Sequence, residues 1–599
     1  MREFTVPPTV TVSGEDNLSD LVFANAERFG GAIVYRRKIS GSWVDVTAQE
    51  FAAQVAAVAK GLVASGIQPG DRVGLLSRTR YEWTLLDFAI LAAGGVTVPV
   101  YETSSAEQVE WILSDSGARA AVVESAAHRA TVESVRERLP ELATVWQLDT
   151  GGEQGAVEAL SELGRDLPDD ELHARRRQVG GDDLATLVYT SGTTGRAKGC
   201  ELTHRNLLAE TRTVVRAAPE LLNPDAQILL FLPLAHVLAR VIQLTGFHCR
   251  ATVGHTPDVK NLLPDLAEFR PTMVLSVPRV FEKVYNSAKQ RAHADGKGKI
   301  FDVAEATAVA WSQAQDTGGP GLLLRLRHGL FDRLVYGKLR AALGGRCTAA
   351  VSGGAPLGAR LGHFFRGIGI TVYEGYGLTE TSAAATVGLP RHFKVGTVGR
   401  PIPGVTVRIA DDGEVLIKGD VVFRGYWHNE AATADALTTD GWLHSGDIGE
   451  LDAEGYLRIT GRKKELIVTA GGKNVAPAVL EDRLRAHPLI SQCMVVGDNQ
   501  PFIGALVTID AEAFPVWRDG HGKSGEVAGL VDDPELRAEI EAAIAEANKA
   551  VSAAEAIKKF RILPVDFTED GGQLTPTLKL KRNVVAKEYA HEIDAIYAR

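Results

Sequence analysis

The sequence predicts an α/β protein of more than one domain, and three observations lead to this prediction. The chain has 599 residues, more than a single hydrophobic core normally organises. Residues 47–100 alternate helical patterns with short apolar strands, which is typical of a largely parallel sheet. From residue 404 onward, apolar and polar positions alternate one by one, as they do in antiparallel strands. We therefore expect a parallel α/β part followed by a smaller antiparallel part.

The first helix of the α/β part has a recognisable start. Thr47 and Glu50 have the spacing of a capping box, and an Ala/Val-rich helix follows to about Ser65. After it we expect a strand, a helix that ends at two glycines, and a second strand, at residues 72–76, 81–93 and 96–100. The segment therefore predicts a βαβ-type unit.

The pattern recurs further along the chain and then changes. A buried strand is expected at 184–189, followed by a glycine-rich turn and a helix that starts near Thr203. An Asp412–Gly413 turn between two alternating segments indicates a β-hairpin. After Arg462 a smaller unit begins, with a helix at 478–486, strands at 493–496 and 503–509, and a polar surface insertion at 519–533.

Composition excludes several classes of protein. The net charge of -10 argues against a broad nucleic-acid-binding face, and we expect no nucleic-acid partner. The four cysteines are far apart, which argues against a zinc site or a disulfide framework. Neither a signal peptide nor an apolar stretch of membrane-spanning length is evident. These features predict a cytoplasmic protein.

The strongest local signal is the segment from Thr190 to Gly199, which reads TSGTTGRAKG. Glycines allow backbone amides to approach phosphate oxygens, hydroxyl groups add donors, and Lys198 adds a positive charge. A buried strand before the segment and a helix after it favour a phosphate-binding loop over an ordinary polar turn. A kinase-type Walker A loop does not fit, because Lys198 precedes a glycine where that motif requires lysine followed by Ser or Thr.

With this loop and the motifs that follow it in order, the chain resembles the superfamily of acyl- and aryl-CoA synthetases, peptide-synthetase adenylation domains and luciferases. Within it, the chain is similar to bacterial, actinobacterial-like long-chain fatty-acid CoA ligases (AMP-forming). The segments that carry this likeness are residues 231–237, 270–284, 373–381 and 574–581. The resemblance implies a large N-terminal domain (1–462) of two α/β subdomains plus a β-barrel-like subdomain, and a small mobile α+β C-terminal domain (463–599).

The resemblance also implies a nucleotide site. ATP or AMP would be held by the phosphate loop, by a turn at 373–380, and by an aspartate and an arginine further on. The implied residues are Thr190, Ser191, Gly192, Thr193, Thr194, Gly195, Lys198, Gly354, Ala355, Glu374, Gly375, Tyr376, Gly377, Thr379, Asp447 and Arg462. Tyr376 matches the aromatic residue on adenine, and Asp447 matches a carboxylate that accepts bonds from both ribose hydroxyls. Thr379 matches the α-phosphate ligand and Glu380 the Mg²⁺ ligand.

The remaining implied roles concern the reaction itself. Lys579 matches the lysine of adenylate formation, although Thr577–Leu578 replaces the usual Ser–Gly before it and Lys581 is a competing choice. His236 is expected to gate or position the acyl carboxylate, without acting as a base. Lys464 matches the hinge of the C-terminal domain. The loop that meets CoA would contain Gly471, Gly472 and Lys473.

These assignments imply an enzyme that activates a long-chain fatty acid with ATP and Mg²⁺ and passes the acyl group to coenzyme A. Three alternatives stay open: a fatty-acyl-AMP ligase that loads a carrier protein, an adenylating enzyme for aryl or short acids, and a non-catalytic acyl- or nucleotide-binding protein in fatty-acid uptake. Because long acyl chains partition into membranes, transient peripheral contact with the inner face of the membrane is also expected.

Overall fold

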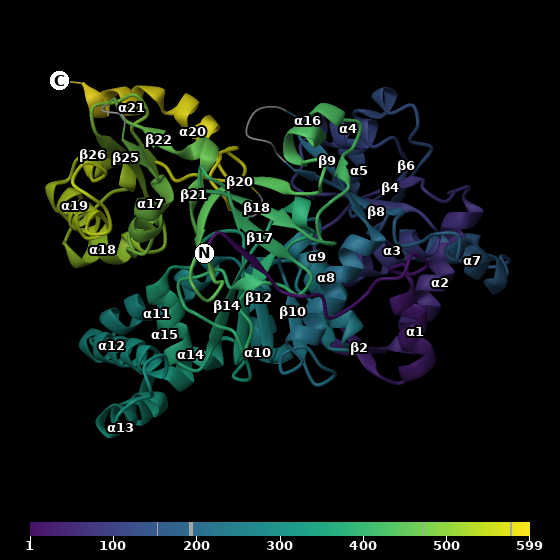
Figure 1. Cartoon of the computed structure of the whole chain (residues 1–599), viewed down its shortest axis with the longest axis horizontal. Coiled ribbons are helices and arrows are strands. Elements are labelled where there is room, and N and C mark those ends of the chain that lie inside the picture. The colour runs from purple at the N-terminus through teal and green to yellow at the C-terminus, as the bar shows by residue number, and fades with distance from the viewer. Residues whose placement is uncertain (153, 191–195, 471–472, 576–577, 599) are drawn as a thin grey trace.

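The computed structural model describes residues 1–152, 154–190, 196–470, 473–575 and 578–598. Two large mixed sheets form the body of the protein (Figure 1). The first has seven strands in the order β19 (Gly425–Tyr426), β9 (Lys198–Thr203), β8 (Leu184–Thr190), β5 (Val96–Val100), β4 (Arg72–Leu76), β6 (Ala118–Val123) and β7 (Thr144–Gln147). Its strands from β8 to β7 are parallel, as predicted, while β9 and β19 run antiparallel at one edge.

The second sheet has nine strands. Their order is β16 (Arg400–Pro401), β15 (Thr386–Val387), β14 (Thr371–Tyr376), β13 (Ala349–Ser352), β12 (Met273–Ser276), β10 (Gln227–Leu230), β11 (Thr252–His255), β2 (Ile33–Ile39) and β3 (Ser42–Thr47). The strands from β14 to β2 are parallel, and an antiparallel pair closes each edge. Parallel strands end together, so the carboxyl ends of β13 and β14 deliver Ser352 and Tyr376 to one region.

Helices cover these sheets, and the first of them begins where the sequence predicted. Thr47 accepts a hydrogen bond from the Glu50 amide (3.2 Å), and the Glu50 carboxylate accepts one from the Thr47 amide (2.8 Å), which caps α2. The helices of the large body are α1 (Asp20–Phe29), α2 (Ala48–Ala64), α3 (Tyr81–Ala92), α4 (Ala106–Asp115), α5 (Ala126–Glu133), α6 (Ala156–Leu163), α7 (Asp169–Arg176), α8 (His204–Ala217), α9 (Val237–His248), α10 (Leu262–Phe269), α11 (Pro278–Ala294), α12 (Gly298–Gln315), α13 (Leu322–Phe331), α14 (Gly337–Ala342), α15 (Ala359–Gly367) and α16 (Glu430–Ala436).

One strand was not predicted from the sequence. Between the glycine-rich loop and the predicted helix, strand β9 pairs antiparallel with β8. Burial explains why this segment is a strand: Cys200 and Leu202 of β9 are fully buried and belong to the hydrophobic core. The helix still starts near the predicted residue, with Thr203 as the N-cap of α8.

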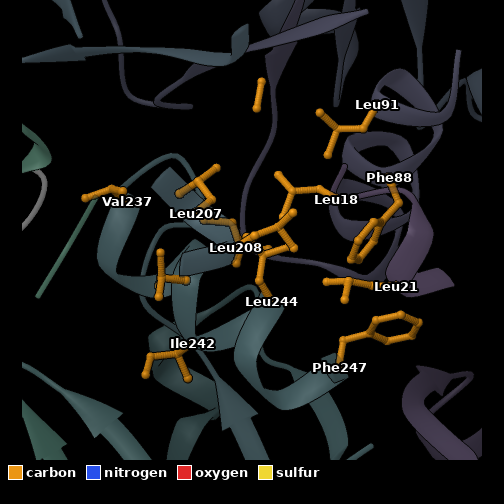
Figure 2. Packing of buried hydrophobic residues seen from close by; sticks show 14 of the residues in the cluster. Leu18, Leu21, Phe88, Leu91, Leu207, Leu208, Val237, Ile242, Leu244 and Phe247 are labelled. Atoms are coloured by element: carbon orange, nitrogen blue, oxygen red, sulfur yellow. The ribbon is translucent and has the colours of Figure 1, made fainter. Parts of the chain in front are cut away.

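The helices α1, α3, α8 and α9 bring the two sheets together. Figure 2 shows Leu18, Phe88, Leu208 and Phe247 packed in this region, all of them completely buried. Val237 and Ile242 of α9 lie at the edge of the same cluster. This core therefore fixes α8 and α9 as rigid walls beside the sheets.

A third sheet and a separate lobe complete the chain. The third sheet is antiparallel, in the order β1 (Glu3–Thr5), β17 (Thr406–Ile409), β18 (Glu414–Lys418), β20 (Leu443–Leu451) and β21 (Leu457–Arg462), and it contains the predicted hairpin. The lobe contains β22 (Ile467–Val468), β23 (Asn474–Val475), α17 (Pro477–Arg485), β24 (Ile490–Val496), β25 (Ile503–Ile509), α18 (Phe514–Gly520), α19 (Pro534–Asn548), β26 (Ile557–Ile562), α20 (Arg582–Glu588) and α21 (Ala590–Tyr597). In Figure 1 it stands beside the body, next to α11 and β21.

The architecture is that of a large α/β body with a small α+β C-terminal unit, as the sequence predicted. The predicted strand at 503–509 has the same bounds in the structure, and the predicted helix at 478–486 is displaced by one residue. The stretch at 519–533 begins within α18 and is otherwise largely exposed. Among the helices of the described ranges, none has the length and apolar character that a membrane span requires. All four cysteines are free and buried.

Candidate active site

A cavity of about 2120 Å³ lies where the ends of β8, β13 and β14 meet the third sheet and the C-terminal unit. Most of the predicted site residues that the structure describes line it. These residues are Thr190, Lys198, His236, Gly354, Ala355, Glu374, Gly375, Tyr376, Gly377, Thr379, Glu380, Asp447, Arg462, Lys464, Lys579 and Lys581. A pocket for a single drug-sized ligand has about 300–1,000 Å³, so this cavity is large enough for two substrates side by side.

Several of the predicted site residues are not among those that line the cavity. Ser191, Gly192, Thr193, Thr194 and Gly195 lie outside the described residues, and so do Gly471 and Gly472. Lys473 is described, but it does not line the cavity. Its Nζ instead lies 3.4 Å from Glu555 Oε1 within the C-terminal unit.

Tyr376, Asp447 and Arg462 form a hydrogen-bonded group at one side of the cavity. Tyr376 ends β14, and its hydroxyl donates to Asp447 Oδ2 at 2.6 Å. Asp447 on β20 faces Arg462 on β21 across the strand pair, and Arg462 Nε lies 3.2 Å from Asp447 Oδ1. Burial, with the neighbouring Asp447, raises the pKa of Tyr376 well above its usual range, so this hydroxyl remains a donor. The group offers an aromatic face and a carboxylate in the same place.

Lys198, Tyr426 and Glu380 form a second group. The Tyr426 hydroxyl donates to Glu380 Oε1 at 2.6 Å, and Lys198 Nζ lies 4.9 Å from the centre of the Tyr426 ring. Tyr426 reaches this position because β19 pairs with β9, the strand that begins at Lys198. Sequence reasoning missed Tyr426, since no motif surrounds it and only the pairing of two distant strands brings it to the site. The group combines a cation with a hard oxygen donor.

Glu374 supports the loop beside the group of Tyr376, Asp447 and Arg462. Its Oε2 accepts a hydrogen bond from the Leu357 amide at 3.0 Å, which ties β14 to the loop that contains Gly354 and Ala355. Burial raises the pKa of Glu374 to about 7. Gly354 lines the cavity and has a φ of +86°, a conformation that favours glycine. Glu374 therefore positions this loop.

His236 caps α9 at the edge of the cavity. Its Nδ1 accepts a hydrogen bond from the Leu238 amide at 3.2 Å. Burial and the nearby positive charge of Lys579 lower the pKa of His236 to about 3, so the ring is neutral at physiological pH. Because Nδ1 accepts, the neutral ring carries its proton on Nε2. His236 can thus donate a hydrogen bond to a carboxylate but is a poor base.

Lys579 enters the cavity from the C-terminal unit. The turn that carries it is closed by the Thr575 amide, which donates to the Lys579 carbonyl (2.8 Å), and by the Lys579 amide, which donates to Thr575 Oγ1 (3.0 Å). A Cβ placed on Gly354 would lie 3.8 Å from Lys579 Nζ, so the amine sits against the Gly354 loop. Burial and the charge of Arg462 lower the pKa of Lys579 to about 8.

A separate stretch of the cavity wall is apolar. It is formed by α8, α9 and neighbouring loops, and includes Val214, Leu221, Leu222, Val241 and Ile242. These side chains belong to the core cluster or pack against it, so the wall is rigid. Sequence reasoning did not assign these side chains to the site, because a helical apolar stripe looks the same whether it faces a core or a cavity.

Family models match both the body and the C-terminal unit of the chain. The family model described as "AMP-binding enzyme" matches residues 22–427, and "AMP-binding enzyme C-terminal domain" matches residues 464–599. The chain belongs to the AMP-binding enzyme family. Enzymes of this family use ATP and CoA.

Relatives over the full length agree with this placement. The chain is 58% identical to the long-chain-fatty-acid–CoA ligase FadD15 of Mycobacterium tuberculosis over 599 residues, which is all of both chains. It is 34% identical to the long-chain-fatty-acid–CoA ligase ACSBG2 of Gallus gallus, over 96% of this chain and 81% of that one.

Two solved structures share the fold. One is the anthranilate CoA ligase AuaEII in complex with anthranoyl-AMP, with a TM-score of 0.74, 19% identity and coverage of 98% and 99% of the two chains. The other is the adenylation domain of a carboxylate reductase from Mycobacterium chelonae, with a TM-score of 0.75, 23% identity and coverage of 98% and 92%. At these identities the likeness speaks for the fold alone, a large N-terminal and a small C-terminal domain.

Proposed function

We propose that the chain is an AMP-forming long-chain fatty-acid–CoA ligase. The observation that carries this proposal is one cavity lined by the group of Tyr376, Asp447 and Arg462, by Lys579 of the C-terminal unit and by an apolar wall. A nucleotide fits against Tyr376 and Asp447, and a long acyl chain fits along α8 and α9. The full-length relatives at 58% identity, described as long-chain-fatty-acid–CoA ligases, support the same substrate class.

In the first half-reaction, the carboxylate attacks the α-phosphorus of ATP and pyrophosphate leaves. Asp447 and Arg462 bind the ribose, and Lys198 and Thr379 bind phosphate oxygens. Lys579 lies between the carboxylate and the α-phosphate, where a cation aligns the attack and stabilises the developing charge. His236 donates from Nε2 to orient the acyl carboxylate.

Glu380 fits a Mg²⁺ ion. Its carboxylate lines the cavity and is oriented by Tyr426, and a hard cation that is shared with phosphate oxygens needs few protein carboxylates. A bound Mg²⁺ would neutralise charge on the leaving pyrophosphate. Within the described residues, no group of three or more His, Cys, Asp or Glu side chains gathers that could hold a metal ion without other ligands.

The second half-reaction requires a different arrangement of the C-terminal unit. We place the boundary of this mobile domain at residue 463 and its hinge at Lys464, where β21 leads into the lobe. Rotation there would withdraw Lys579 and bring the loop of Gly471, Gly472 and Lys473 toward the cavity. The thiolate of CoA then attacks the acyl carbon, AMP leaves and the thioester forms. The location of Lys473 against Glu555, away from the cavity, fits the adenylate-forming arrangement.

A chain-length series tests the substrate assignment. AMP release is measured with ATP, Mg²⁺ and CoA for saturated acids from short to long. We expect kcat/KM to peak at long chains. Ile242→Trp adds bulk to the apolar wall of the cavity and should move that peak to shorter acids. A peak at aryl or short acids that Ile242→Trp leaves in place would contradict the assignment. The use of ATP and CoA also favours a cytoplasmic location.

A further inference from the structure

Helix α13 (Leu322–Phe331), with the π-helical turn that follows it at Asp332–Tyr336, presents a row of leucines to solvent. Leu322, Leu323, Leu326, Leu330 and Leu334 have between 52% and 81% of their surface exposed. Positions 322, 326 and 330 recur every four residues, so they lie on one face of the helix. Single exposed leucines are ordinary, but five on one short segment form an apolar patch of the kind that marks an interaction site.

The opposite face of α13 is held firmly against the body. The His328 ring stacks on Trp311 of α12 with 4.0 Å between ring centres, and His328 Nε2 lies 2.7 Å from the Gly367 carbonyl. Phe331 is buried in the core that α12 and α15 share. The side of α13 that carries His328 and Phe331 thus contacts the body, and the leucines lie on the side that faces solvent. In Figure 1, α13 lies at the outer tip of the group of body helices that includes α12 and α15.

The charge around the leucines differs from that of the rest of the chain. Residues 320–346 contain six basic residues and one acidic residue, in a protein of net charge -10: Arg325, Arg327, Arg333, Lys338, Arg340 and Arg346, with Asp332. Asp332 already pairs with Arg340 at 2.7 Å. In the part of the chain that the structure describes, no carboxylate pairs with Arg327, Arg333 or Lys338, and all three are exposed.

We propose that α13 is a docking surface for an anionic lipid bilayer. Its exposed leucines would enter the interface, and Arg327, Arg333 and Lys338 would contact lipid phosphates. An apolar face flanked by arginine and lysine is what an interfacial helix requires. A second copy of the chain is a poorer occupant, because a symmetric contact would bring two basic faces together.

Flotation with vesicles tests this proposal on the full-length protein. The probes are vesicles of neutral phosphatidylcholine and of phosphatidylcholine with 30% phosphatidylglycerol (~30% anionic lipid gives a surface potential in the range that attracts basic segments). No ATP, acid or CoA is present, so failure here would leave the proposed ligase activity untouched. We expect binding to the anionic vesicles, weakened as NaCl is raised.

Two triple variants address the two components of the surface. Arg327→Gln/Arg333→Gln/Lys338→Gln should weaken binding about fivefold per charge, on the order of 100-fold in total. Leu323→Gln/Leu326→Gln/Leu330→Gln should weaken it by on the order of 100-fold or more, because three apolar side chains no longer enter the interface. Glutamine keeps good helix propensity, and a circular dichroism melt verifies that both variants are folded.

Matched controls carry the same changes elsewhere. Arg119→Gln/Arg216→Gln/Lys587→Gln removes the same net charge from scattered exposed positions, and Leu163→Gln/Leu263→Gln/Val516→Gln removes exposed apolar groups. Both controls should bind like the wild type. Equal binding of the α13 variants and their controls would overturn the proposal. So would the absence of wild-type binding, or a concentration-dependent dimer in sedimentation that the leucine variant abolishes.

Discussion

Replacing Lys579 by alanine should separate the two half-reactions. The amine lies against the Gly354 loop, with 3.8 Å between its Nζ and a Cβ placed on Gly354. Other predicted nucleotide contacts, such as Asp447 and Arg462, come from the body and would remain in place. The loss should therefore fall on adenylate formation, with substrate binding largely retained.

The expected size of the loss follows from the role of the cation. Removing one preorganised group that stabilises transition-state charge costs about 10²–10³ in rate. We expect ATP–pyrophosphate exchange to fall by that factor in Lys579→Ala. Thioester formation from supplied acyl-AMP should change by less than about threefold, since Lys579 is withdrawn in that step.

The pKa of Lys579 adds a second signature. At about 8 it leaves the amine largely protonated at pH 7 and about one-tenth protonated at pH 9. If the protonated form is the active one, exchange should fall about tenfold between its low-pH plateau and pH 9. Lys579→Arg keeps its charge throughout this range, so its profile should stay flat.

Lys581→Ala is the matched control, because Lys581 also lines the cavity and was the competing choice. It should retain exchange activity. Equal loss of both half-reactions in Lys579→Ala, or an equal loss in Lys581→Ala, would refute the division of roles.

Three further predictions follow from buried or interdomain contacts. Burial raises the pKa of Glu210 well above its usual range, so the folded chain keeps a proton that the unfolded chain releases above about pH 4.5. Stability should therefore fall with rising pH, and Glu210→Gln should be less pH-sensitive in urea melts at pH 6 and 8; parallel curves would contradict this. Tyr426→Phe removes the 2.6 Å hydrogen bond to Glu380, worth about 1.5–3 kcal/mol, and should lower exchange about 10- to 100-fold with a higher Mg²⁺ requirement. Arg279→Gln breaks a 3.2 Å contact to Asp510 between the body and the C-terminal unit. ATP–pyrophosphate exchange should fall by up to about fivefold. An equal fall in thioester formation from acyl-AMP would count against a role of this contact in the adenylate-forming arrangement.

Much of the fold could be predicted because it depends on local sequence patterns. The capping box of Thr47 and Glu50, the Asp412–Gly413 turn and the period of the apolar residues each act over a few neighbouring positions. Strand β9 was missed because its burial depends on pairing with β8 and β19, which no local pattern reveals. Whether a segment forms a strand depends strongly on the neighbouring strands and side chains that it packs against.

Part of the candidate site could likewise be predicted from local motifs, and part depends on how distant segments meet. Motifs indicated Tyr376, Asp447 and Lys579, yet the Tyr376–Asp447 hydrogen bond and the position of Lys579 against the Gly354 loop depend on how separate elements meet. Tyr426 lies in no motif at all. The leucines of α13 can be read in the sequence, but their exposure can be known only once the opposite face of the helix is seen to be occupied.

The central claim, transfer of a long acyl chain to CoA, is tested most directly by identifying the product. The protein is incubated with ATP, Mg²⁺ and palmitate, with and without CoA, and the acyl species are identified by mass spectrometry. We predict free palmitoyl-CoA in multiple turnovers when CoA is present, and at most one equivalent of bound palmitoyl-AMP when it is absent. Palmitoyl-AMP that stays bound and indifferent to CoA would contradict the account and favour a carrier-loading ligase, whereas no acyl product with any acid would favour a non-catalytic binding protein.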